Sequence, residues 1–287
     1  MNLNDKALLV QLSIRQWTAR KVDKRVTDEV NTSNGASNKA GRYNKSLLPL
    51  NEYLADVNYK TGQIRNNFYI NTLPWGMDGM QILPSANYLN FMSDFRKQKN
   101  DWDFLVREFI ANYDTLVFQA QADLGSLFST DDYPLASELH KKFSIDLNVM
   151  PVPTNDFRVS LANDELTQLE AEWEARKLAA QREAMKEVWN RLYEQVVRLN
   201  ERLSNVPDSS KKDFRATIID TALDTCSMLT RLNFTDDPNL EAMRSALEGK
   251  LVGMDADTLR NDKVLRKDVA DTTKDIMDKM SVFMNGL

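Results

Sequence analysis

His140 and Cys226 are the only histidine and the only cysteine among the 287 residues, and this scarcity limits the chemistry of the chain. One copy cannot build a Cys/His zinc site, a Cys–His nucleophile pair or a two-histidine metal site. Carboxylate, lysine or backbone-phosphate chemistry remains open, but each usually comes with a recognisable motif. We therefore predict no catalytic, cofactor-binding or metal-binding residue, and we expect Cys226 to be a small buried apolar side chain.

Acidic residues whose spacing could suggest a metal site are better explained by local structure. Asp78 stands between two glycines, and acidic pairs begin at Asp131 and Asp236. Calcium needs more oxygen ligands from one loop than any of these places supplies, and the EF-hand spacing is missing. We interpret Asp131, Asp132 and Asp236 as residues that form turns or cap helices.

Other familiar catalytic arrangements are also missing from the sequence. The loop GASNKAG (35–41) has one residue too many between its glycines for a phosphate-binding loop, and Arg42 and Tyr43 stand where Lys-Ser or Lys-Thr is needed. No G-x-S-x-G, H-E-x-x-H or D-x-S-x-S motif occurs, so hydrolase and metal-adhesion functions lack their residues. We expect His140 to lie on the surface near a helix C-terminus, and the acidic residues of 164–174 to face water.

Basic and aromatic residues near the N-terminus are the one group for which we predict a contact with a partner. Residues 1–49 carry a net charge of +5, whereas the whole chain carries −5. Positive side chains could neutralise phosphates while Trp17 or Tyr43 stacks on a base. Alternatively, the same side chains contact an acidic surface of the fold or of a protein partner. The candidate contact residues are Arg15, Trp17, Arg20, Lys21, Lys24, Arg25, Arg42, Tyr43, Lys45 and Trp75.

The composition indicates what kind of fold must position these residues. Charged residues make up 28% of the chain and hydrophobic residues 42%, as in soluble globular proteins, and the few glycines and prolines favour long helices. No uncharged stretch approaches 18 residues, and the N-terminus lacks the basic start of a signal peptide. We expect a cytoplasmic protein without a membrane segment.

Periodicity predicts two strands and several helices. Apolar and polar residues alternate over 8–15 and again over 143–150, and we expect these two strands to pair. The turn-rich stretch 31–41 is predicted to be a flexible loop, and 74–84 an irregular connector. Helices are predicted at 18–30, 50–71, 85–125, 135–142, 163–204, 211–232, 238–247 and from 257 to near the end.

The stretch 163–204 contains neither glycine nor proline and is predicted to be one amphipathic helix. At about 1.5 Å per residue it would be roughly 60 Å long, so it should project or pair with another long helix. We expect Leu169, Trp173, Val188 and Leu192 on its apolar stripe to be covered by other helices.

Together these elements predict a mainly α fold with a small β element, of the α+β class, with a long projecting amphipathic helix and a C-terminal helical bundle. We predict a mixed α+β domain over 1–160, the long helix over 161–205, and a C-terminal helical region over 206–287.

Five motifs give the chain a resemblance to a known family. They are LSIRQWTARK (12–21), GRYNKSLLP (41–49), NTLPW (71–75), ILPSANY (82–88) and KFSIDLNVMPVP (142–153). The chain resembles a family of uncharacterised proteins from tailed bacteriophages and some bacteria, a domain of unknown function, over nearly its whole length. Genes of that family tend to neighbour those for a MoxR-like AAA+ ATPase and a von Willebrand factor A-like protein.

The resemblance implies a context rather than an activity. The chain has neither the phosphate loop of the ATPase nor the metal-dependent adhesion motif, so it would be a third component, an adaptor, a substrate or a scaffold. We expect a phage-associated, non-enzymatic adaptor or scaffold, located in the host cytoplasm if phage-encoded, and a homo-oligomer remains open. The alternative is a nucleic-acid-binding protein that uses the basic and aromatic N-terminal segment.

Overall fold

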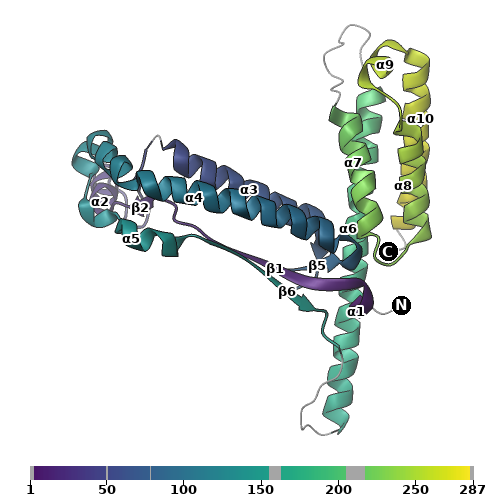
Figure 1. Cartoon of the computed structure of the whole chain (residues 1–287), viewed down its shortest axis with the longest axis horizontal. Coiled ribbons are helices and arrows are strands. Elements are labelled where there is room, and N and C mark those ends of the chain that lie inside the picture. Colours follow the sequence, from purple (N-terminus) through teal and green to yellow (C-terminus); the bar gives the residue numbers. More distant parts are fainter. Residues whose placement is uncertain (1–2, 50, 78, 155–162, 205–216, 285–287) are drawn as a thin grey trace. The chain divides into compact units, whose positions relative to one another are not determined.

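The computed structural model describes residues 3–49, 51–77, 79–154, 163–204 and 217–284, and helices dominate these residues (Figure 1). The strands form a four-stranded sheet and a two-stranded sheet. This confirms the predicted fold class, mainly α with a small β element. The chain divides into two compact units, and neither is one continuous stretch of sequence. The first unit comprises Met1–Gln11, Phe68–Met92 and Asn148–Leu287, and the second comprises Leu12–Asn67 and Ser93–Leu147.

The four-stranded sheet has the order β4-β5-β1-β6. β1 and β6 are neighbours, which confirms the predicted pairing of the two alternating segments. β5 also pairs with β1, antiparallel, with Leu9 opposite Ile82. The strands are β1 (Ala7–Arg15), β4 (Leu73–Pro74), β5 (Met80–Pro84) and β6 (Ser144–Pro151).

The prediction of an irregular connector over 74–84 is wrong for β5. Its five residues end in three successive buried side chains, Ile82, Leu83 and Pro84, so they lack the alternation that marks a half-buried strand. Gly79, with a φ of +74°, lies in the connection between β4 and β5, which pair antiparallel.

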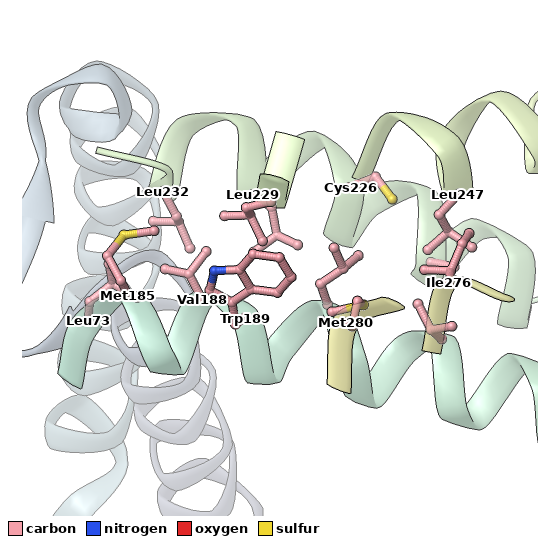
Figure 2. Packing of buried hydrophobic residues seen from close by; sticks show 14 of the residues in the cluster. Leu73, Met185, Val188, Trp189, Cys226, Leu229, Leu232, Leu247, Ile276 and Met280 are labelled. Atoms are coloured by element: carbon pink, nitrogen blue, oxygen red, sulfur yellow. The ribbon is translucent and has the colours of Figure 1, made fainter. Parts of the chain in front are cut away.

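The predicted long helix is a single continuous helix, α6 (Asn163–Ser204). α10 and α7 lie along its later part, and α8 packs against both of them (Figure 1). Met185, Val188 and Trp189 of α6 meet Leu229 of α7 and Met280 of α10 in the core (Figure 2). The other helices of the first unit are α1 (Leu3–Lys6), α7 (Thr217–Leu232), α8 (Pro238–Leu251), α9 (Ala256–Asn261) and α10 (Lys263–Met284).

Two of these helices replace the one predicted from residue 257 onwards. The helix is interrupted at Asp262. The carboxylate of Asp262 accepts hydrogen bonds from the backbone N–H groups of Val264 and Leu265, both at 2.9 Å. Asp262 thus caps the N-terminus of α10, and an N-cap starts a new helix because its own backbone is not helical. The predicted helix over 211–232 is present as α7 from Thr217, and 211–216 lie outside the described residues.

In the second unit, α3 and α4 pack side by side, and the Trp102 indole donates a hydrogen bond to the Thr61 hydroxyl at 2.8 Å. α3 (Glu52–Asn71) and α4 (Tyr88–Leu124) match the predicted helices closely. The last residues of α3, from Phe68, and the first residues of α4, up to Met92, belong to the first unit. The remaining elements are β2 (Arg20–Val22), α2 (Lys24–Ser33), β3 (Asn44–Ser46), α5 (Ala136–Leu139) and short 3-10 turns, η3 (Thr130–Asp132) and η4 (His140–Lys142) among them.

The predicted helix over 18–30 is wrong in its first part. Residues 20–22 form β2, which pairs antiparallel with β3, and the helix begins only at Lys24. Asp23 caps α2 by accepting a hydrogen bond from the Val26 N–H at 3.1 Å. The valine spacing at 22 and 26 therefore spans a strand and a helix.

Candidate functional site

Lys45, one of the predicted contact residues, is buried in an ion-pair cluster of the second unit. Its ammonium nitrogen lies 2.6 Å from Asp132 Oδ2 and 3.2 Å from Asp23 Oδ2, and it donates to the Leu127 carbonyl at 2.7 Å. The side chain is only 6% exposed. Burial alone would lower the pKa of Lys45, but the hydrogen bonds to Asp132 and Asp23 raise it above its ordinary value. Its positive charge is therefore paired with carboxylates of the same chain.

Two further basic residues of the set are also paired within the chain. Lys21 Nζ lies 2.6 Å from Asp132 Oδ1, and Arg25 lies 3.5 Å from Glu29 on the same helix face. Burial would raise the pKa of Asp132, but hydrogen bonds from Lys21 and Lys45 lower it below its ordinary value. Asp132 thus joins two cations in addition to forming the predicted turn.

The two tryptophans of the set pack within the protein. The Trp17 ring lies 5.8 Å from the Tyr113 ring and 6.2 Å from the Phe109 ring, and it is half-buried. Trp75 is buried in the first unit, 6.3 Å from the Trp173 ring. Their indoles contribute to the aromatic packing of the fold.

The remaining residues of the set are exposed, and most of them gather at β2, α2 and β3. The Tyr43 backbone accepts from Asp23 N–H at 2.9 Å and donates to Thr27 Oγ1 at 3.0 Å, which fixes Tyr43 beside the start of α2. We call the exposed residues Arg20, Lys24, Arg42 and Tyr43, which β2, the first turn of α2 and the residues just before β3 carry, together the basic surface.

Arg15 lies apart from the basic surface. It lines a hollow of about 440 Å³ together with Trp17 and with side chains of α5 and η4. The other lining residues are Gln16, Glu138, Lys141 and Lys142. The structure therefore splits the predicted set into a buried cluster, packed aromatics, the basic surface and this hollow.

Sequence reasoning did not single out a surface at the beginning of α6. Its first turns extend beyond the strands of the first unit with no described helix beside them (Figure 1). Leu169 is 38% exposed, and Leu166 and Trp173 are half-buried on the same stripe. The prediction that helices cover the whole stripe is therefore wrong for Leu169, and it is confirmed for Val188 and Leu192, which are fully buried.

A hollow of about 370 Å³ adjoins this stripe. Trp75, Met77 and Trp173 supply its aromatic and apolar wall, and the Met77 side chain is itself exposed. The Trp173 Nε1–H is buried and meets no acceptor within the described part of the chain. We call Leu166, Leu169, Trp173 and the hollow the α6 surface.

The α6 surface is strongly acidic. Residues 163–175 contain five carboxylates and no lysine or arginine. Glu172 pairs with Arg176 at 3.6 Å and Glu174 with Lys177 at 2.6 Å. Glu165 and Glu170 flank the apolar stripe on its two sides, as their helical positions require. The signal that could have found this surface is the run of acidic residues along a leucine and tryptophan stripe.

The structure places the only cysteine on a buried helix face and the only histidine at the surface. Cys226 is fully buried on α7, as predicted, and burial raises the pKa of its thiol to about 11. His140 is exposed at the surface in η4. Within the described residues, no group of three or more histidine, cysteine or acidic side chains is arranged to hold a metal ion.

Comparison of the chain with protein-family models, curated proteins and solved structures gives no match. Among the residues that the structure describes, no helix is both long and apolar enough to cross a membrane.

Proposed function

We propose that this chain is a non-enzymatic interaction protein, an adaptor or scaffold, that binds a partner protein through the α6 surface. The observation that carries the proposal is an apolar helix stripe that the helices of the described residues leave uncovered, next to a hollow walled by two tryptophans. Exposed apolar patches bordered by charged residues are typical of protein-binding sites. Tryptophan and arginine, both present here, are enriched among the residues that dominate binding energy.

The hollow beside Trp173 supports the same proposal. An apolar anchor of a partner fits between Trp75, Met77 and Trp173, which supply the wall of the hollow. This kind of recognition needs no bond-breaking step.

The family resemblance suggests which partner to test first. A MoxR-like AAA+ ATPase or a von Willebrand factor A-like protein from the same source would make this phage-associated chain the third component of their assembly. The acidic character of the α6 surface favours a basic docking segment on that partner.

The test is a pull-down from the source cells with three forms of the chain, each performed with and without nuclease. Wild type and the variant Leu89→Asp should retain the same partner, because Leu89 is an exposed leucine on α4 far along the sequence from α6. The variant Leu169→Asp should lose it, because a carboxylate enters the apolar stripe. Equal recovery with all three forms would exclude the α6 surface, and recovery that depends on nucleic acid would argue against an adaptor.

Nucleic-acid binding is the second candidate function, and one observation favours it. Arg20, Lys24 and Arg42 are exposed and form no ion pair within the described residues, and the Tyr43 side chain is 39% exposed. Such a group could contact phosphates and stack on one base. The group has few cations for phosphate contacts, because Lys45, Lys21 and Arg25 of the predicted set are already paired with carboxylates.

A further inference from the structure

We infer that the hollow beside Arg15 and Trp17 binds a small ligand that carries a phosphate group and a flat aromatic ring, as a mononucleotide does. Its volume is about 440 Å³, and it is lined by Arg15, Gln16, Trp17, Glu138, Lys141 and Lys142. All six residues belong to the second unit, whereas the α6 surface belongs to the first. The inference therefore goes beyond the function proposed for the α6 surface and does not depend on it.

A buried phenylalanine of α4 holds two sides of this hollow in place. The Phe109 ring lies 6.2 Å from the Trp17 ring and 5.8 Å from the Phe143 ring. Phe109 and Phe143 are both buried. Phe143 directly follows Lys142 in the sequence, and Arg15 stands two residues before Trp17. The backbone that carries these cations is thus fixed by a packed aromatic core, and such preorganisation reduces the entropy lost on binding.

The segment that carries Glu138 and the two lysines is anchored at two more points. Leu139 of α5 is fully buried. The Tyr113 hydroxyl of α4 donates a hydrogen bond to the Pro134 carbonyl, just before α5, at 2.9 Å. The exposed charged residues of α5 and η4 are therefore attached to a backbone whose apolar side chains are held in the core. The charged groups at the hollow have a defined position rather than a flexible loop to support them.

The charges around the hollow favour an anion. Three cations and one carboxylate line it, a net charge of +2. The two oxygens of Glu138 accept hydrogen bonds from Lys141 Nζ at 2.9 and 2.8 Å. Arg15 and Lys142 form no ion pair within the residues that the structure describes. A phosphate monoester carries about −1.5 to −2 charges at pH 7, which matches this net charge. The Arg15 guanidinium can bind two phosphate oxygens at once, and Lys142 adds a point charge.

The Trp17 indole supplies the apolar wall for the ring of the ligand. The indole is half-buried, and Tyr113 packs edge-on against it at 5.8 Å. The part of Trp17 that lines the hollow is a surface on which a flat aromatic ring can pack. The Gln16 amide is already bonded to Asn58 and Thr61, so it closes the wall without offering a free donor.

The form of the site favours a small ligand over a nucleic-acid strand. Sites for small molecules have volumes of about 300–1,000 Å³ and a few convergent polar groups. A strand is bound along a groove in which cations follow the backbone and several aromatic side chains each stack on a base. Here the cations surround one hollow that a single aromatic side chain walls. One phosphate and one ring match this arrangement.

The experiment is isothermal titration calorimetry of the full chain at low salt with adenosine monophosphate, adenosine and inorganic phosphate as probes. Wild type should bind adenosine monophosphate more tightly than either of the other two. Arg15→Ala with Lys142→Ala should weaken this binding more than about tenfold, because both unpaired cations are lost. The matched control, Lys39→Ala with Lys97→Ala, removes two exposed cations that do not line the hollow and should bind as wild type does.

Two further variants test the carboxylate and the indole separately. Glu138→Gln releases Lys141 and should tighten the binding of adenosine monophosphate about two- to fivefold, the size of an exposed ion pair. Glu108→Gln removes an exposed carboxylate outside the hollow and should leave the affinity unchanged. Adenosine monophosphate should quench tryptophan fluorescence in wild type, and Trp17→Phe should abolish that quenching. Circular dichroism should show all variants to be equally helical.

Several results would overturn the inference. They are the absence of binding at a ligand concentration of about 1 mM, equal losses in the two double variants, and equal affinities for adenosine monophosphate and adenosine. Displacement of adenosine monophosphate by an oligonucleotide without terminal phosphates would replace the small ligand by a nucleic-acid strand. None of these results bears on the partner that Leu169→Asp should lose, because α6 and the hollow belong to different units.

Discussion

At the scale of single residues, Lys45 holds two carboxylates that are 109 positions apart in the sequence, Asp23 and Asp132. Replacing Lys45 by Met leaves both buried without their shared cation, so we expect the free energy of unfolding to fall by about 3–5 kcal/mol. Lys21→Met removes a half-exposed cation and should cost less than about 1 kcal/mol. Urea unfolding followed by circular dichroism measures both, and equal losses would contradict the structural role of Lys45.

The same cluster predicts how stability depends on pH. A backbone hydrogen bond from Val26 and the bond from Lys45 lower the pKa of Asp23, and hydrogen bonds from Lys21 and Lys45 outweigh burial and lower the pKa of Asp132, both below the ordinary 3.8. A lowered pKa in the folded state adds stability that is complete above the unfolded value and is lost as pH falls through the folded one. We expect the urea midpoint to fall as pH drops below 3.8, and Lys45→Met to show a shallower fall. A steeper fall in the variant would contradict this sign.

The burial of Cys226 could be predicted from the sequence, but the burial of Lys45 could not. The reason is how far along the sequence the contacts of each residue lie. Cys226 stands in a helical segment whose apolar spacing already predicts a buried face. The burial of Lys45 depends on Asp132, 87 residues away, and nothing near Lys45 announces that carboxylate. Interactions between residues distant in sequence therefore decided which predicted contact residues remained exposed.

At the scale of elements, α6 is predictable as a helix, while the part of it that stays uncovered is not. The apolar spacing continues along the whole stripe, so periodicity alone implies a covered face from end to end. At about 1.5 Å per residue, α6 is about 63 Å long and α10 about 33 Å, so α10 can cover little more than half of it. Which half is covered depends on how the chain turns between helices.

The covered and uncovered parts of α6 predict that two similar substitutions on this helix lower the free energy of unfolding by unequal amounts. Leu192→Ala removes a fully buried side chain and leaves a cavity, so we expect a loss of about 2–5 kcal/mol in the free energy of unfolding. Leu169→Ala shortens an exposed side chain and should change that free energy by less than about 0.5 kcal/mol. Denaturant unfolding of both variants checks the comparison, and a large loss for Leu169→Ala would mean that the isolated chain covers this residue.

The short strands were the least predictable elements. β2 and β3 have three residues each, too few for an alternating pattern to appear, and β4 has two. Their positions depend on backbone hydrogen bonds to partners elsewhere in the chain, as β5 depends on β1. The longer β1 and β6 show clear alternation and were predicted correctly as neighbours.

At the scale of the whole molecule, the salt dependence of nucleic-acid binding distinguishes the two candidate functions. The chain carries a net charge of −5, and the basic surface offers only three unpaired cations, so phosphate contacts should contribute a salt slope of no more than about 3. We expect weak binding of single-stranded DNA and RNA at low salt and none that is tight at physiological salt. Fluorescence anisotropy across a salt series measures this. Tight, salt-steep binding that Arg20→Ala with Lys24→Ala and Arg42→Ala abolishes would make nucleic-acid binding the primary function.

Each compact unit is built from separate stretches of the sequence, and this determines the order in which the two units can fold during synthesis on the ribosome. All residues of the second unit lie within 12–147, so that unit can fold once these have left the exit tunnel. Leu3, Ala7 and Leu9 belong to the core of the first unit together with Met280, which is translated long after the whole second unit. Leu9 can meet Ile82 of β5 early, but the core that covers both is complete only after α10 has been translated, a contact pattern that slows folding and exposes the chain to aggregation. Proteolysis of nascent chains stalled at increasing lengths should show protection of the second unit well before that of the first.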